Sequence, residues 1–192
     1  FDLFYGREGQ SVEQWRSELT EALRHAADHL SLYQLTIEPG TMFAARHEAG
    51  TLRVPDAALA REFYLLTQEL CEAAGLPAYE VSNHARPGSE SRHNLIYWRG
   101  HDYAGIGAGA HSRITIEGKR RALSNIKSPE AWRERVEATG HGLESAEDLS
   151  AAESADEYLL MGLRLAEGID LNRLQAISGQ AASRETVDAL SA

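Results

Sequence analysis

Histidine side chains gather in one part of the sequence. His84, His93, His101 and His111 are four of the eight histidines of the chain. Imidazole is the commonest side-chain ligand of metals, so a zinc site or a haem-iron site is one interpretation. The spacings of 9, 8 and 10 residues differ from the His-x-x-x-His pattern that puts two ligands on one helical turn. The alternative is a set of loop histidines at the rim of a pocket.

The hexamer from His93 to Trp98 combines the groups that a porphyrin needs. His93 offers a nitrogen for iron, and Asn94 offers an amide that could fix the orientation of the ligand. Tyr97 and Trp98 add two large flat faces that could form apolar walls. The alternative is a turn followed by an aromatic strand that packs in the core.

Residues 105–110 formally fit the G-x-G-x-x-A motif of dinucleotide-binding proteins. That motif follows an apolar strand, opens a helix and needs an acidic residue ~20 positions further on. Here a predicted β-hairpin follows the glycines, and Ser124 and Asn125 stand where the acid is required. We therefore reject a dinucleotide site. The alternating glycines indicate instead that the backbone passes close to a ligand or to another strand.

Asp2 lies in a strand-like segment whose next turn begins at Gly6. A carboxylate at the carboxyl end of a barrel strand faces the usual mouth of the active site. An ordinary acid that faces a loop is the alternative, and position alone does not decide between them.

Alternating strands and helices are expected to position these residues. A capping box at Ser11–Gln14 predicts a helix that runs to about His29, and Pro55 opens a second helix that Gly75 closes. Strands are expected at 1–5, 30–37 and 79–82. Repeated β then α units predict a parallel α/β sheet or barrel.

The pattern changes after about residue 90. Residues 91–112 are rich in the residues of loops, and a β-hairpin is expected with its turn near Gly118. From Pro129 onward we expect mainly helices, at 151–166, 170–177 and 186–190.

Composition argues against several classes of protein. The chain has 19 basic and 29 acidic residues, a net charge of -10, and no basic stripe of the kind that binds nucleic acid. It has no apolar run near the ~20 residues that span a bilayer and no signal peptide, so we expect a cytoplasmic protein that is not an integral membrane protein. Cys71 is the only cysteine, which excludes an internal disulfide and a Cys-rich metal site. The strand-like start predicts that the chain begins inside a domain.

Four segments together, in their order and spacing, resemble one family. They are residues 2–11, 33–41, 79–88 and 93–111, which include YQLTIEPGT, YEVSN and HNLIYW. They resemble the HemW branch of the radical S-adenosylmethionine superfamily, which is related to the oxygen-independent coproporphyrinogen III oxidases. Residues 161–168 resemble the C-terminal domain of that family. The resemblance covers nearly the whole chain, which would be roughly the second half of a full member.

The resemblance implies an α/β fold. Residues 1–112 would be the last strands and following loops of a partial (β/α)6 barrel. Residues 113–192 would be the hairpin and a small, mainly helical, truncated C-terminal domain of the HemN type.

The resemblance also implies cofactors and site residues. In the family, a CxxxCxxC motif in the first half binds a [4Fe–4S] cluster, which holds S-adenosylmethionine; that motif is absent here. Asp2 matches the aspartate that contacts S-adenosylmethionine. The HNxxYW motif, which the HemW branch uses for haem, assigns His93 as the ligand of haem iron, with Asn94, Tyr97 and Trp98 beside it. Glu8 stands where the family has proline, so we expect a looser loop after Asp2.

Three functions follow as hypotheses. The first is a haem chaperone that binds haem and transfers it to apoproteins such as respiratory haem enzymes, with a homodimer among the expected assemblies. The second is a radical enzyme that decarboxylates coproporphyrinogen III. The third is a segment whose pocket is only structural. Authentic oxidases carry a sequence of the type HRNFQGYT in place of the hexamer, which favours the chaperone, and no catalytic residue is assigned.

Overall fold

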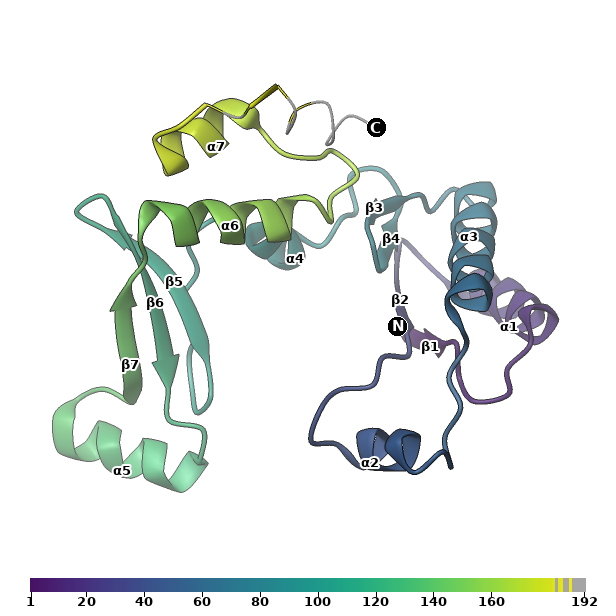
Figure 1. Ribbon diagram of the computed structural model, residues 1–192, viewed down its shortest axis with the longest axis horizontal. Helices are drawn as coiled ribbons and strands as arrows, with labels where there is room; N and C mark the ends of the chain where they lie inside the picture. The colour runs from purple at the N-terminus through teal and green to yellow at the C-terminus, as the bar shows by residue number, and fades with distance from the viewer. Residues whose placement is uncertain (182, 185–186, 188–192) are drawn as a thin grey trace. The chain divides into compact units, whose positions relative to one another are not determined.

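The computed structural model describes residues 1–181, 183–184 and 187. The chain divides into two compact units, residues 1–91 and 92–192. Figure 1 labels the helices and strands of both units. The division falls between Ser91 and Arg92, whereas the sequence suggests a boundary after residue 112, a position that strand β5 crosses. The assignment of 1–112 and 113–192 to two family domains stays a prediction.

The first unit is built on a four-stranded sheet with the order β1-β2-β4-β3. Strand β1 (Asp2–Tyr5) pairs parallel with β2 (His29–Gln34), so that Asp2 lies opposite Ser31. Strands β4 (Asn83–Ala85) and β3 (Ala78–Glu80) add in antiparallel orientation. The sheet is therefore mixed rather than wholly parallel as expected. A tight connection leads from β3 to β4, and so short a connection can join only antiparallel neighbours.

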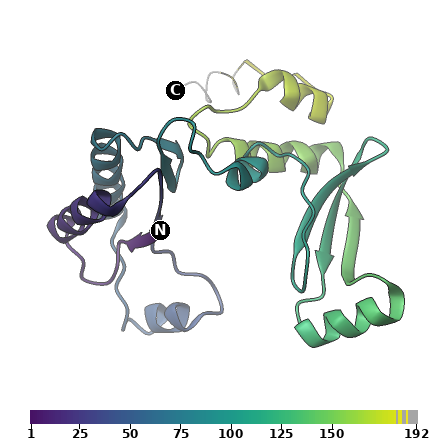
Figure 2. The ribbon, with the colours of Figure 1, turned by 180° about the vertical axis from the view of Figure 1, so that it is seen from behind.

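Two helices cover one face of this sheet. Helix α1 (Val12–His25) and helix α3 (Ala57–Ala73) lie on the same side of it, as the two views in Figures 1 and 2 show. The indole Nε1 of Trp15 donates to Thr67 Oγ1 at 2.9 Å and so joins the two helices inside the core. The buried apolar residues of this core are Tyr5, Trp15, Leu19, Leu30, Leu32, Phe63, Leu66, Cys71 and Leu76.

Local sequence signals set several boundaries in this unit. The capping box is present, because Gln14 N donates to Ser11 Oγ and Ser11 N donates to the side chain of Gln14. Helix α1 nevertheless ends at His25, earlier than expected, because Ala26 is already extended and β2 starts at His29. Pro55 precedes the N-cap Asp56 instead of opening α3. A short helix, α2 (Met42–Glu48), was not expected and is capped by Thr41.

The second unit combines an antiparallel sheet with helices. The sheet has the order β5-β6-β7, from β5 (His111–Ile116), β6 (Lys119–Asn125) and β7 (Leu143–Asp148). The hairpin turn lies at Glu117-Gly118, as predicted, and both residues have positive φ. The helices are α4 (Arg92–Trp98), α5 (Pro129–Thr139), α6 (Ala151–Gly162) and α7 (Leu171–Ser178). Ala155, Tyr158 and Leu174 form the buried centre between α6 and α7.

Three expectations for this unit are wrong. Residues 92–98 form a helix instead of a loop or a strand. Strand β7 was not expected, because its sequence LESAED has no β-branched or aromatic residue. Helix α6 ends at Gly162 and the chain then turns, whereas the pattern predicted helix to 166. The short helix expected at 170–177 is present as α7, and the one expected at 186–190 lies outside the described residues apart from Val187.

None of the helices in the described residues is both long enough and apolar enough to cross a membrane.

Candidate functional site

The face of the first sheet away from α1 and α3 carries several polar side chains of its strands. Side chains alternate along a strand, so Leu30 and Leu32 enter the core while His29, Ser31 and Tyr33 face the other way. Asp2 is exposed and lies opposite Ser31, on this polar face. It is the first residue of β1, so it does not occupy the carboxyl end of the strand as expected. The sheet thus presents Asp2 opposite Ser31, with the Phe4 and Tyr33 rings further along the same face.

A buried hydrogen-bond chain organises the same face. The carboxylate of Glu80 accepts from the amide of Asn83 and from Ser82 N at 3.0 Å. The hydroxyl of Ser31 donates to Asn83 Oδ1 at 2.8 Å. Glu80 and Asn83 are almost fully buried, which makes such pairing necessary. Sequence reasoning missed these residues as site candidates, although YEVSN belongs to the motifs that it singled out.

The loop after β1 is held by side chains rather than by a proline. Gln10 Oε1 accepts from Gly6 N at 2.9 Å, and Gly6 has a φ of 71° that favours glycine. Glu8 Oε1 accepts from Arg53 N at 3.1 Å, and Arg7 pairs with Glu18 at 2.6 Å. Glu8 therefore supplies part of the restraint that proline would give, and the loop is tied down at several points.

Helix α4 carries the hexamer that sequence analysis assigned to haem. His93 is exposed and lies one turn before Tyr97, whose ring meets the imidazole edge-on with centroids 4.8 Å apart. Tyr103 packs against Tyr97 at 4.5 Å and is fixed by two backbone hydrogen bonds to Arg113 of β5. Asn94 is half-buried next to His93. An accessible imidazole thus sits beside two tyrosine rings.

Trp98 points to a different side of α4. Five residues of helix separate it from His93, which is a rotation of about 140°. The guanidinium of Arg164 lies over the indole, 4.4 Å from the ring centroid. Trp98 also lines a cavity of about 330 Å³ with His101, Tyr158 and Arg173, and His93 and Tyr97 do not line this cavity. The structure therefore brings His93 and Tyr97 together but sets Trp98 apart from them.

The clustered histidines have unlike surroundings. His84 is buried in β4, and neither ring nitrogen has a hydrogen-bond partner in the described part of the chain. Burial lowers the pKa of His84 to about 4, with Glu80 opposing and His29 adding to the effect. His101 and His111 are exposed. Among the described residues, no group of three or more His, Cys, Asp or Glu side chains could hold a metal ion.

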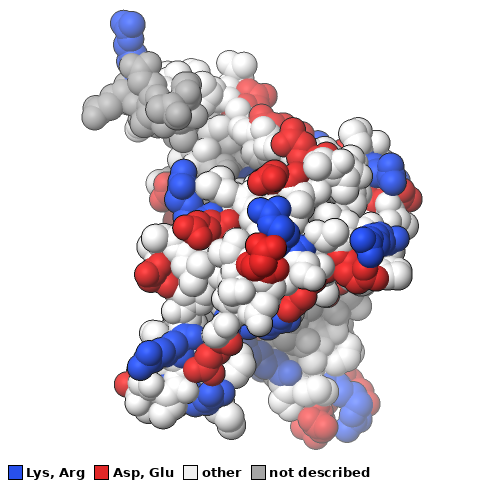
Figure 3. Space-filling view, turned by 90° about the vertical axis from the view of Figure 1, so that its right-hand side faces the viewer, with Lys and Arg blue, Asp and Glu red and all other residues white. Residues whose placement is uncertain are grey.

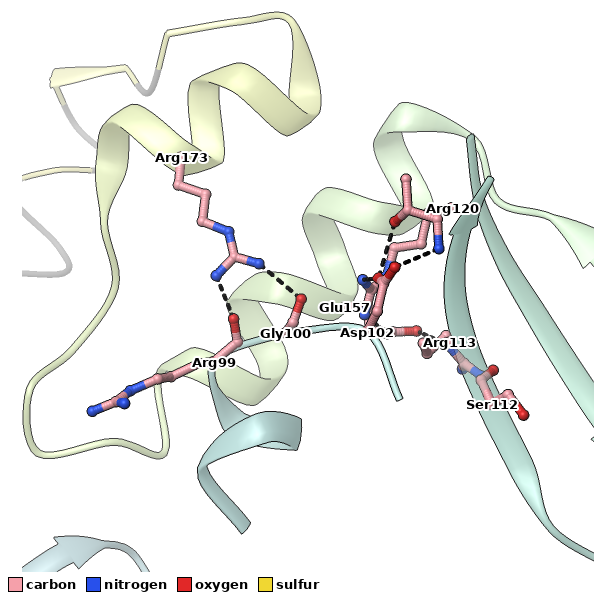
Figure 4. Close-up of polar contacts among 9 residues, drawn as sticks. Arg99, Gly100, Asp102, Ser112, Arg113, Arg120, Glu157 and Arg173 are labelled. Atoms are coloured by element: carbon pink, nitrogen blue, oxygen red, sulfur yellow. Dashed lines mark hydrogen bonds and ion pairs between the residues drawn. The ribbon is translucent and has the colours of Figure 1, made fainter. Parts of the chain in front are cut away.

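A network of ion pairs joins the sheet of the second unit to α6. Glu157 accepts from Arg113 at 2.7 Å and from Arg120 at 3.3 Å, as Figure 4 shows. Arg120 also pairs with Asp102 at 3.1 Å, and Asp102 accepts from Thr115 N at 2.6 Å. These contacts fix the loop after α4 to the hairpin.

Charges of both signs are interspersed on the face drawn in Figure 3, where Lys and Arg alternate with Asp and Glu. That face offers no continuous basic surface among the residues described. The expectation that nucleic acid is not a partner remains a prediction.

Comparison with known proteins identifies relatives over almost the whole chain. It is 41% identical over 183 residues to radical S-adenosyl methionine domain-containing protein 1, mitochondrial, of Mus musculus, with 93% of this chain and 41% of the relative covered. It is 37% identical over 178 residues to the haem chaperone HemW of a Synechocystis species, with 92% of this chain and 42% of the relative covered. The HemW of Mycobacterium tuberculosis is 35% identical, with 98% of this chain and 47% of that protein covered. This chain is a homologue of the HemW-like radical SAM proteins.

The HemW-like chain also shares its fold with a solved structure. Coproporphyrinogen III oxidase (HemN) from Escherichia coli superimposes with a TM-score of 0.68 at 19% identity, over 93% of this chain and 43% of that one. The expected α/β fold, which matches part of the HemN fold, is therefore confirmed. No family model matches the sequence. The chain spans a little under half the length of the curated relatives it matches.

Full-length radical SAM relatives imply an iron–sulfur cluster and S-adenosylmethionine. The residues of this HemW-like chain do not fit the cluster, because Cys71 is its only cysteine and is fully buried in the core. Burial raises the pKa of the Cys71 thiol to about 12, whereas a cluster ligand must be a thiolate. Asp2, exposed on the polar face, does fit as a group that accepts hydrogen bonds from S-adenosylmethionine.

Proposed function

We propose that the protein to which this chain belongs is a haem chaperone, which binds haem and transfers it to apoproteins. In this proposal the imidazole of His93 would bind the haem iron. The observation that supports it is the exposed His93 imidazole on α4 with the Tyr97 ring 4.8 Å away. The identity of 35 to 37% to proteins named haem chaperone HemW supports the same function.

The geometry suits a ligand that must be both held and released. An exposed imidazole can reach the iron without rearrangement of a buried core, and Tyr97 and Tyr103 offer aromatic surface next to it. In this proposal Asn94, which follows His93, orients the ligand. Trp98, which the hexamer motif also assigns to haem, faces the cavity of about 330 Å³ on another side of α4 and does not share the surface formed by His93 and Tyr97.

Haem titration of the full-length protein tests the iron ligand. We expect His93→Ala to lower haem affinity at least about tenfold and to shift the Soret band, because an iron–nitrogen bond is lost. Tyr97→Leu should weaken binding with less change in the spectrum, since it removes the aromatic ring beside His93 but leaves the ligand. Trp98→Leu should have the smaller effect of the two, because Trp98 lies on another side of α4.

His141→Ala is the matched control, because His141 is an exposed histidine of the same unit outside the hexamer. It should bind haem like the parent protein. The ligand assignment fails if His93→Ala keeps the parent's affinity and spectrum while His101→Ala or His111→Ala loses them. Haem binding that survives every one of these changes would place the haem site outside this chain.

The second candidate function is an oxygen-independent coproporphyrinogen III oxidase. The fold similarity to HemN favours it, although 19% identity shows the fold alone. An anaerobic assay for protoporphyrinogen formation with S-adenosylmethionine separates the two. Product formation by the full-length protein would favour the oxidase, whereas haem binding without product would favour the chaperone.

The remaining parts of the proposal concern the whole protein. S-adenosylmethionine and a [4Fe–4S] cluster are its cofactors, and Asp2 is this chain's contact to S-adenosylmethionine. The partners are haem and haem-accepting apoproteins, respiratory haem enzymes among them, and a homodimer is the proposed assembly. The proposed location is the cytoplasm.

A further inference from the structure

A cavity of about 550 Å³ in the C-terminal unit is lined by the start of α6, by α7 and by the hairpin end of β5 and β6. Its volume is within the range of small-molecule sites. It adjoins the cavity that Trp98 faces, but Ala151 and Ser154 line only the larger of the two. The start of α6 therefore gives this cavity a chemistry of its own.

A buried hydroxyl group lines this cavity. Ser154 is only 8% exposed, and its hydroxyl has no hydrogen-bond partner in the described part of the chain. Buried hydroxyls normally have such a partner. The hydroxyl of Ser150, one turn earlier, is used within the helix cap, where it accepts from Glu153 N. Folding thus leaves the donor of Ser154 for a ligand in the cavity.

The first turn of α6 adds backbone donors to this hydroxyl. The first N–H groups of a helix have no acceptor within it, and together they attract anions. Ala151 is the first residue of α6 and lines the cavity. It lies three residues before Ser154, on the same face of the helix. The carboxylate of Glu153 accepts from Ser150 and does not line the cavity.

Arg173 supplies a fixed positive charge at the same cavity. Its two terminal nitrogens donate to the backbone carbonyls of Arg99 and Gly100, the latter at 2.8 Å, as Figure 4 shows. Its guanidinium lies over the ring of Tyr158, 4.9 Å from the centroid, and Tyr158 follows Ser154 by one turn of α6. A guanidinium has five N–H donors, so three are left for a ligand.

The carboxylates of the cavity are already paired. Asp102 and Glu157 both form ion pairs with Arg120, at 3.1 and 3.3 Å, as Figure 4 shows. Arg173 has no carboxylate partner among the described residues. In a chain of net charge -10, its uncompensated charge makes this cavity a local site for an anion.

The ligand must combine a multiply charged anion with an apolar body. A phosphate monoester carries a charge of about −1.5 to −2 at pH 7 and three acceptor oxygens, which suits a guanidinium, a hydroxyl and a helix N-terminus together. A carboxylate has one charge and two oxygens. Leu149, Ala176 and Ile177 also line the cavity and leave apolar surface that an inorganic anion would not cover.

We propose that this cavity binds a phosphate monoester, whose phosphate contacts Arg173, the hydroxyl of Ser154 and the first turn of α6. The apolar part of the ester packs on the apolar lining. The proposal goes beyond the haem function and does not rest on it, because none of these contacts involves residues 93–98.

Phenyl phosphate is the probe, titrated into the full-length protein in phosphate-free buffer near neutral pH and followed by isothermal calorimetry. We expect the parent to bind it with a Kd below about 1 mM. Inorganic phosphate should bind more weakly, because it leaves the apolar lining uncovered. Benzoate, which joins the same ring to a carboxylate, should also bind more weakly than phenyl phosphate.

Ser154→Ala is the sharpest variant, because its hydroxyl has no partner to lose and the fold should keep its stability. We expect affinity for phenyl phosphate to fall roughly tenfold, as for loss of a hydrogen bond to a charged group. Arg173→Gln should lower it by more than about tenfold, since a charge-assisted bond is lost. Far-UV circular dichroism reports whether Arg173→Gln folds, and Ser154→Ala decides the matter if it does not.

Arg133→Gln is the matched control for charge. Arg133 lies on α5, is 59% exposed and pairs with Glu137, so the same charge change occurs away from the cavity. This variant should bind phenyl phosphate like the parent. His93→Ala, the variant that tests the haem proposal, should do so as well.

The inference is overturned if the parent does not bind phenyl phosphate, if benzoate binds as tightly, or if Ser154→Ala binds like the parent. Loss of phenyl phosphate binding in His93→Ala would also overturn it, because the site would then belong to the proposed haem surface. Haem titration of Ser154→Ala should match that of the parent, so either proposal can fail while the other stands.

Discussion

At the scale of single residues, chemistry depends on surroundings that residue type does not reveal. His84 and His93 are both histidines of the same cluster in the sequence, yet one is enclosed in a β-sheet and the other is accessible on a helix. His101 differs again, because its pKa is lowered first by burial and then by the nearby charges of Arg173 and Arg99. The environment of His84 therefore leads to a prediction about stability, and the exposure of His93 leads to a prediction about binding.

His84 should make the protein less stable in mild acid. Its pKa is lowered from 6.5 to about 4, so it is neutral in both states above pH 6.5 and adds no pH dependence there. Between pH 6.5 and 4 the unfolded chain takes up a proton that the folded chain does not, and the free energy of unfolding falls on the order of 3 kcal/mol. Urea titrations at pH 7, 5.5 and 4.5 measure this slope.

The variant His84→Leu should flatten that part of the profile. Leucine fills a similar volume and removes two buried nitrogens that lack partners, so stability at pH 7 should be maintained or raised. A variant whose stability falls with acid as steeply as that of the parent would show that other groups cause the slope.

At the scale of elements, the glycine-rich segment 105–110 is a loop that hydrogen bonds hold to neighbouring segments. Gly109 N donates to Ile126 O at 2.8 Å, Asn125 Nδ2 donates to Gly107 O at 2.8 Å, and Gly105 N donates to Ser112 Oγ at 2.9 Å. A Cβ on Gly105 would lie 2.1 Å from the carbonyl oxygen of His111. The glycines predicted that the backbone passes close to a ligand or to another strand. At Gly105 the backbone passes close to strand β5 of the same chain.

Gly105→Ala should destabilise the protein by roughly 2 kcal/mol or more, because backbone must move to admit the methyl group. Gly107→Ala is the control: its φ is +100° but no atom lies within 4 Å of the added Cβ, so only the backbone conformation is strained, at a cost of roughly 1 kcal/mol. Chemical denaturation of both variants compares the two. Equal losses would contradict the steric explanation.

At the scale of the whole molecule, this chain supplies only part of a radical SAM protein. It contributes Asp2 and the hexamer that we propose binds haem, but no group suited to hold an iron–sulfur cluster. Cys71 packs with Phe63, Leu66 and Leu76 in the core of the first unit.

Cys71→Ala in the full-length protein should therefore leave the iron and sulfide content unchanged. We expect it to cost about 1 kcal/mol of stability, as for loss of a small buried group. Anaerobic reconstitution followed by iron analysis and the visible absorption spectrum makes the measurement. Loss of the cluster in a variant that still folds would assign Cys71 a ligand role that its burial argues against.

The sequence by itself determined those features that depend on neighbouring residues. The capping box at Ser11–Gln14, the turn at Glu117-Gly118 and the presence of strands β1 and β2 were all predicted, because each signal lies within a few residues. Motif order and spacing likewise indicated the HemW-like family, which the relatives confirm.

Only the tertiary structure decided how distant segments pair. Strand β7 exists because β6 offers it an edge, and its own residues carry little strand propensity. Helix α4 forms from aromatic and β-branched residues of modest helix propensity because it packs against α6. The separation of Trp98 from His93 follows from that helix. Arg173 lies far along the chain from Arg99 and Gly100, so no local pattern could place its guanidinium on their carbonyls or reveal the cavity that it lines.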